Sequence, residues 1–230
     1  DFSNLQSAID TAADGDILLV RGGSYAGPGF PLQAPMTIDG KSLTIQEDVG
    51  PPAVLLTSGL VVRNIGAGQR VVVRGITVSC NVELVVEDCA GVVWFEDVIV
   101  SGQCTPFESV TSTLIDHCDQ VIFNRCNLIG GSPFAFAETT SNSVHATQSK
   151  VHLYDTLVTG GESNGPVPSA YGMRMDGGLL MASGSTIRGG GTANQIPCGG
   201  AGLWLASGFP KAYLLDTTVT GGEGGCGLAP

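Results

Sequence analysis

Short stretches in which hydrophobic and polar residues alternate recur along most of the chain. Six of them carry small or apolar residues at their first, third and eighth positions, and they begin at Val71, Val93, Val121, Val151, Leu180 and Ala212. These starts lie 22, 28, 30, 29 and 32 residues apart. Alternation with a period of two is typical of half-buried strands, and a repeat of this length with glycine turns is typical of a parallel β-solenoid.

A second short strand precedes each of the six repeats. These strands begin at Leu60, Leu84, Leu114, Val144, Met173 and Leu203. Weaker matches at Ile17 and Leu43 bring the prediction to about eight rungs. Because the period varies while the strands persist, we place a loop of variable length in one connection of each rung. We therefore predict a single all-β solenoid domain over residues 17–230.

The first sixteen residues follow a different pattern. Phe2, Leu5, Ala8, Ile9, Ala12 and Ala13 fall at helical spacing, and Asp14-Gly15 ends it. We predict that residues 1–16 form an amphipathic cap over the edge of the first rung. No such cap is found at the other end, where the chain stops within a repeat. We expect more of the natural protein, or another chain through end-to-end or lateral self-association, to cover that end.

Composition narrows the classes of partner. Hydrophobic residues make up 43% of the chain, which is enough for a core, and the net charge is −11. Such a charge disfavours a nucleic-acid partner, since phosphates are bound by cations. No apolar run approaches the 18 residues of a membrane-spanning helix, so we expect no membrane insertion.

Two segments near the start carry a family resemblance. The first comprises Leu5–Asp10, Ala12–Asp16, Val20 and Gly23–Tyr25, and the second is Asp39–Ile45. They resemble the opening of secreted right-handed parallel β-helix proteins of the pectate-lyase-like (pectin lyase-like) group. The resemblance implies a right-handed parallel β-helix and an extracellular or cell-surface location. The group includes polysaccharide lyases, hydrolases, epimerases, phage tailspikes and non-catalytic surface proteins, so it implies an architecture rather than one activity.

Alternation along the two strands of each rung predicts which side chains point outward. One outward column reads Val61, Val85, Ile115, His145, Arg174 and Trp204, and the other reads Val72, Trp94, Ile122, His152, Met181 and Tyr213. Trp204, Trp94 and Tyr213, with His152 beside them, can contact sugar rings. Alternatively, these aromatic residues cover the barrel beneath loops or contact a second chain. We expect a polysaccharide or another protein chain as the partner.

A catalytic alternative rests on His145 and Arg174, which lie one rung apart, with Asp176 nearby and Asp116 one rung back. A His or Arg there can abstract the proton α to a uronate carboxylate. Alternatively, these are a surface histidine and an arginine paired with a neighbouring acid. The Asp array that holds Ca²⁺ in pectate-lyase-like enzymes is replaced here by Val61, Val85 and Ile115. We therefore favour binding or assembly without catalysis, and keep a polysaccharide lyase or epimerase as the alternative.

The remaining charged residues suggest structural roles. We expect no cofactor, although the pairs Asp14/Asp16, Glu47/Asp48 and Glu87/Asp88 can hold Ca²⁺ loosely. The fifth repeat position reads Gly75, Asp97, Arg125, Asp155, Gly184 and Asp216. This predicts a ladder with Arg125 between Asp97 and Asp155. Arg74 over Glu96 is expected to form an ordinary pair between rungs.

Seven cysteines complete the candidate chemistry. Three pairs of cysteines hold matching positions in neighbouring repeats, so their Cα atoms should lie one above the other. The pairs are Cys80 with Cys104, Cys89 with Cys118 and, with looser alignment, Cys198 with Cys226. Stacked Cα atoms about 4.8 Å apart lie within disulfide range, so we predict these three bridges and an oxidising compartment. Cys126 falls at an inward position and is predicted to be a buried, unreactive thiol.

Overall fold

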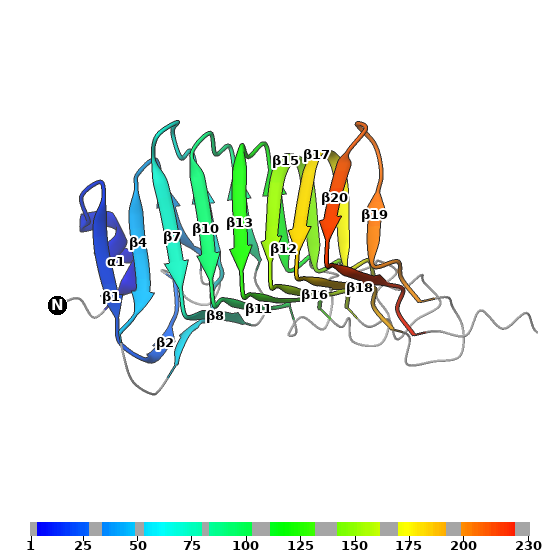
Figure 1. Cartoon of the computed structure of the whole chain (residues 1–230). Coiled ribbons are helices and arrows are strands. Elements are labelled where there is room, and N and C mark those ends of the chain that lie inside the picture. Colours follow the sequence, from blue (N-terminus) through cyan, green and yellow to red (C-terminus); the bar gives the residue numbers. More distant parts are fainter. Residues whose placement is uncertain are drawn as a thin grey trace, which may run out of the picture.

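In the computed structural model of the chain, the structure describes residues 4–27, 34–48, 53–79, 83–102, 111–131, 142–161, 170–191 and 199–223. Within them the chain winds into a parallel β-solenoid (Figure 1). Three strands make up a complete turn, so the strands form three series along the axis. We call the outward surfaces of these series the first, second and third faces.

The first series follows the row of strands labelled along the front of Figure 1. It contains β1 (Asp16–Val20), β4 (Leu43–Glu47), β7 (Arg70–Arg74), β10 (Val92–Glu96), β13 (Gln120–Asn124), the second halves of β15 (Val144–Tyr154) and β17 (Met173–Ser183), and β20 (Lys211–Leu215).

The second series is built from short strands. It contains β2 (Gly23–Tyr25), β5 (Val54–Leu56), β8 (Ile76–Ser79), β11 (Ile99–Ser101), β14 (Asn127–Ile129), β16 (Leu157–Thr159), β18 (Thr186–Arg188) and β21 (Thr218–Thr220). The third series contains β3 (Met36–Asp39), β6 (Leu60–Arg63), β9 (Leu84–Glu87), β12 (Thr113–Asp116), the first halves of β15 and β17, and β19 (Leu203–Leu205).

The number of turns depends on how the ends are counted. Eight strands stack in the sheet of the second series, which is the number of rungs expected from the sequence. About five turns are inner turns, which means that a complete three-stranded turn lies on each side of them. These inner turns begin at β4, β7, β10, β13 and the second half of β15. The closed part of the solenoid is therefore about five turns rather than eight, because the outer turns have such a neighbour on one side only.

The core is a set of inward columns that run along the axis. The first, third and eighth repeat positions point inward as predicted, and Val71, Phe95 and Val100 are fully buried. Phe95 and Phe123 stack with ring centroids 5.0 Å apart and planes at 13°. Removing this apolar surface from water is the main force that holds the turns together.

In most turns, two of the three corners include a residue with positive φ. Between the third and first series these residues are Gly40, Asn64, Asp88, His117, Gln148 and Gly177, with φ from 45° to 83°. Between the first and second series they are Gly75, Asp97, Arg125, Asp155, Gly184 and Asp216. Gly, Asn and Asp adopt this left-handed conformation most easily. The residues at the fifth repeat position, which were expected to form a charge ladder, thus serve mainly to turn the backbone between the first and second series.

The N-terminal cap is confirmed as a short helix, α1 (Leu5–Thr11). Asn4 caps it by accepting a hydrogen bond from the Ser7 N–H, and Leu5, Ala8 and Ile9 are buried. Gln6 pairs with the exposed edge of β3: its side chain accepts from the Thr37 N–H at 2.8 Å and donates to the Thr37 carbonyl at 3.1 Å. The helix thereby satisfies part of an open sheet edge. No helix in the described part of the chain is long and apolar enough to span a membrane.

Candidate functional site

Strand pairing brings together the main candidates on the third face. His145 on β15 pairs with Arg174 on β17, and Arg174 pairs with Trp204 on β19. Asp176 follows Arg174 by two residues, so period-two alternation puts both side chains on the outward side. His145, Arg174 and Asp176 therefore meet, as their places in the repeat predict.

Asp176 is the centre of this cluster. Its carboxylate accepts hydrogen bonds from Arg174 Nε at 2.7 Å, Arg174 Nη2 at 3.3 Å and the Ser207 hydroxyl at 2.9 Å, and it contacts His145 Nε2 at 2.7 Å. Burial alone would raise the pKa of Asp176, but the hydrogen bonds from Arg174, His145 and Ser207 outweigh it and lower the pKa. Asp176 is therefore charged near neutral pH and anchors the cluster.

An aromatic pair borders the cluster. The Arg174 guanidinium lies 4.8 Å from the centre of the Trp204 ring, a cation–π contact. The Tyr171 ring lies 4.4 Å from the Trp204 ring. Trp204 is 38% exposed, but its ring already contacts two partners. Ser207 and Tyr171 were not identified from the sequence because both lie outside strands, where the repeat gives no register.

Asp116 is not part of this cluster. The pairing places it opposite Thr147, which in turn pairs with Asp176, so Asp116 lies two turns before Asp176. Its carboxylate contacts His117 Nδ1 at 2.9 Å. The same pairing corrects the outward column, because Leu114 pairs with Val85 and His145, whereas Ile115 is buried. The prediction was shifted by one residue since Thr113, a polar residue, occupies the inward position.

The outward column of the first face has the predicted register, although neighbouring side chains leave Val72 and Ile122 only 6% and 5% exposed. Trp94, Ile122, His152, Met181 and Tyr213 pair in succession, with Val72 before them. The Arg70 guanidinium lies 5.1 Å from the centre of the Trp94 ring. Burial, followed by the charge of Lys150, lowers the pKa of His152, so its imidazole is neutral near pH 7. Tyr213 is 61% exposed, which leaves it the most accessible aromatic ring of this column.

A groove of about 480 Å³ lies over the last turns of the first face. Tyr154, Ser183 and Leu215 pair in succession along one side, and Met181 pairs with Tyr213 along the other. Ser183 is small, so it leaves a hollow between Tyr154 and Leu215. The Tyr154 hydroxyl lies 3.4 Å from His152 Nδ1. The groove has the volume of a small-molecule site, with apolar walls and hydroxyl groups. The sequence pointed to Tyr213 and His152, but not to Tyr154.

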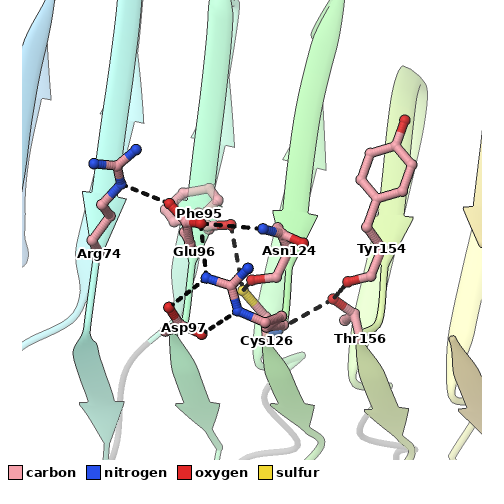
Figure 2. A network of polar contacts seen from close by, with 9 residues as sticks. Arg74, Phe95, Glu96, Asp97, Asn124, Cys126, Tyr154 and Thr156 are labelled. Carbon is pink, nitrogen blue, oxygen red and sulfur yellow. Dashed lines mark hydrogen bonds and ion pairs between the residues drawn. The ribbon is translucent and has the colours of Figure 1, made fainter. Parts of the chain in front are cut away.

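A polar network spans the middle turns (Figure 2). Glu96 contacts Arg74 Nε at 2.7 Å and Arg125 Nη2 at 2.8 Å, and Arg125 also contacts Asp97 at 2.8 Å. The expected pair of Arg74 and Glu96 is confirmed. Arg125 pairs with two carboxylates of the preceding turn and not with Asp155, so the predicted alternating ladder is incomplete. These contacts fix the register of neighbouring turns.

The described cysteines are thiols. Cys89 and Cys118 follow corner residues on consecutive turns, as the repeat predicts, but they are free and buried, without the expected bridge. The Cys118 thiol instead lies 3.2 Å from the Asp116 carbonyl, and Cys89 lies 3.2 Å from the Glu87 carbonyl. The bridges proposed for Cys80–Cys104 and Cys198–Cys226 lie outside the described residues.

Cys126 is a free thiol with 3% exposure, and burial raises its pKa to about 11. It lies directly after the corner residue Arg125 and points into the core (Figure 2). This confirms the prediction of a buried core thiol.

One of the three loose calcium pairs, Asp14/Asp16, has structural contacts. Asp14 accepts from the Ser42 N–H at 2.6 Å, and Asp16 accepts from the Ala13 N–H at 2.8 Å. Among the described residues, no three His, Cys, Asp or Glu side chains gather as a metal site. The Asp14 and Asp16 carboxylates hold the turn before β1.

Together, the strand register and the stacked core define a parallel β-solenoid protein with two outward clusters near its last turns. No protein-family model and no curated protein matches the chain. A solved structure of ORF18 of Geobacillus virus E2 aligns with 9% identity and a TM-score of 0.35. The alignment covers 94% of this chain and 59% of that chain. This chain therefore spans less than two thirds of that protein, and so distant a likeness implies nothing about function.

Proposed function

We propose that the chain is a secreted or cell-surface β-solenoid module that binds carbohydrate without catalysis. The groove on the first face carries this proposal. Its walls include Tyr213 and Leu215, which are 61% and 64% exposed, and its volume is about 480 Å³. Tyrosine rings present an apolar face to the C–H groups of a sugar, and their hydroxyl groups can bond to sugar hydroxyls. The ligand thus lies between Tyr154 and Tyr213, over Met181 and Ser183.

The contacts of Asp176 and Arg174 disfavour these two residues as the base of a lyase. A lyase needs a base that can take up a proton. Asp176 is held as an anion, and Arg174 uses two of its nitrogens on that carboxylate. Trp204 is packed by Arg174 and Tyr171, so it is less free than Tyr213 to receive a sugar.

Binding of a panel of soluble neutral oligosaccharides tests the groove. Tyr154→Ala and Tyr213→Ala should each weaken the affinity at least about tenfold, which corresponds to roughly 1.4 kcal/mol. Trp204→Ala is the matched control, because it removes an exposed aromatic ring from another face, and it should bind as the parent does. Unchanged affinity in both tyrosine variants would rule out the groove.

The lyase or epimerase alternative is favoured by one observation, the convergence of His145 and Arg174 on Asp176. It predicts that incubation with polysaccharides releases unsaturated ends or changes sugar stereochemistry, and that His145→Ala abolishes this. The binding proposal predicts neither product. The same protein serves in both assays, with neutral oligosaccharides for binding and uronate-containing polysaccharides for the release of unsaturated ends, so the two functions are separated directly.

The last turn favours a second candidate function, assembly with a second copy of the chain. Leu205, Leu214 and Val219 hold positions that point inward in the preceding turns, yet they are 41%, 45% and 39% exposed. Apolar exposure of this kind is typical of interaction surfaces. Sedimentation velocity should show reversible, concentration-dependent association, and a monomer at all concentrations would exclude this function.

A further inference from the structure

The second face differs from the rest of the surface in its lack of charge. Its two outward columns are Ser24, Leu55, Thr77, Ile99, Asn127, Leu157, Thr186 and Thr218, and Ser79, Ser101, Ile129, Thr159, Arg188 and Thr220. Arg188 is the one ionisable residue in these columns, and Glu223 neutralises it at 2.7 Å. On a chain of net charge −11, this face is a neutral strip.

The strip is also regular. Eight parallel strands cross it in succession. Hydroxyl and aliphatic side chains therefore repeat at the strand spacing of about 4.8 Å. Ile99 and Leu157 are 42% and 40% exposed, so the aliphatic part of this surface is accessible.

We infer that the second face binds the flat surface of a neutral, insoluble polysaccharide. This inference rests on the proposed function and names the class of carbohydrate. Two properties favour this ligand. Sugar hydroxyls and C–H groups match the side-chain hydroxyls and aliphatic groups of the strip. A rigid polymer also repeats its contacts along the strip, so weak contacts add up by multivalency.

Size and charge disfavour other occupants. Eight strands about 4.8 Å apart, each about 10 Å long, cover only about 400 Å². A stable protein interface buries about 800 Å² on each partner, so a second copy held by this face alone is not expected. An acidic polymer finds no unpaired cation in the two columns and is repelled by the net charge.

Co-sedimentation with insoluble polysaccharides tests the inference. The probes are microcrystalline cellulose, chitin and insoluble β-1,3-glucan, with a calcium pectate gel as the acidic comparison. The parent should bind at least one neutral polymer and bind the acidic gel at least tenfold less. Ile99→Glu and Leu157→Glu should reduce neutral binding at least tenfold. Leu114→Glu, which adds the same charge to an outward position of the third face, is the matched control and should bind like the parent.

The outcomes separate this inference from the proposed function. Because Ile99 and Leu157 point outward, circular dichroism should show all variants folded, and a double variant Thr77→Ala with Thr186→Ala gives a second test without added charge. The inference is overturned if the parent binds none of the neutral polymers, or if the second-face variants bind normally. If soluble oligosaccharides still bind through Tyr213 in that case, the proposed function stands. If they do not bind either, both fail.

Discussion

At the residue scale, one carboxyl group organises the third-face cluster. Asp176 is 12% exposed and receives hydrogen bonds from Arg174 and Ser207 while contacting His145. Because these partners favour its charged form, they lower its pKa from the ordinary value of 3.8. The carboxylate therefore stabilises the fold fully above pH 3.8, and this contribution is lost as the pH falls towards the lowered folded-state pKa.

We predict that Asp176→Asn lowers the free energy of unfolding by about 1–3 kcal/mol at about pH 5. The difference from the parent should shrink at about pH 2.5, where the unfolded carboxyl group is protonated. Urea unfolding at both pH values measures this, and histidines titrate little between them. Asp119→Asn removes an exposed partner of Lys150 and should cost under about 1 kcal/mol. A difference that grows on acidification would contradict the assignment.

A second residue-scale prediction concerns Cys126. Its thiol is buried and its pKa is raised to about 11, so the nucleophilic thiolate is scarce at neutral pH. In the folded protein we expect no reaction of Cys126 with a thiol-specific reagent over hours, and complete reaction in denaturant. Peptide mapping after alkylation, without reduction, identifies which cysteines react. It also tests the proposed bridges, since free Cys80 and Cys104 would show that their predicted pairing is wrong.

At the scale of the strand and its corner, backbone conformation decides which residues are tolerated. Gly178 lies within β17 at φ +83°, and an added Cβ would collide with the Ser149 carbonyl oxygen of the neighbouring turn. Gly15 has a similar φ of +89°, but its Cβ would meet nothing within 4 Å. Substitution of Gly15 therefore introduces backbone strain alone, whereas substitution of Gly178 also introduces a collision with the neighbouring turn.

We predict that Gly15→Ala costs about 1–2 kcal/mol, the strain of a left-handed residue with a Cβ. Gly178→Ala should cost clearly more, because two turns must also move apart. Urea unfolding of both variants gives the two values. Equal costs would mean that the turns separate there without penalty.

The strands and corners also show which parts of the fold and of the candidate site could be predicted from the sequence. The repeat gave the strands, the inward positions and the outward column from Val72 to Tyr213, because alternation and apolar character agree there. It failed at Thr113, where a polar residue is buried. It identified the meeting of His145 and Arg174, but not Ser207 or Tyr171. Those residues lie between strands, and their positions depend on tertiary contacts rather than on periodicity.

At the scale of the whole molecule, stability comes from stacking. Each inner turn buries its apolar columns against turns on both sides, and the Asp14 and Asp16 carboxylates accept hydrogen bonds from backbone N–H groups. We predict that EDTA changes the melting temperature by less than about 2 °C. A fall of more than about 10 °C would show that a cation stabilises the fold. Differential scanning calorimetry with and without added Ca²⁺ measures both.

The third corner of each turn, between the second and third series, varies widely in length. Only three residues separate Leu56 from Leu60, whereas fourteen separate Ile129 from Val144. The solenoid can therefore lengthen its chain along one edge without disturbing the register of the turns. A peptide epitope inserted between Gly102 and Ser112 should leave unfolding cooperative, whereas the same insertion at Arg125 should not. Changes in loop length are thus accommodated at one edge of the solenoid, between the second and third series. New binding specificity can arise in those loops while the stacked strands stay constant.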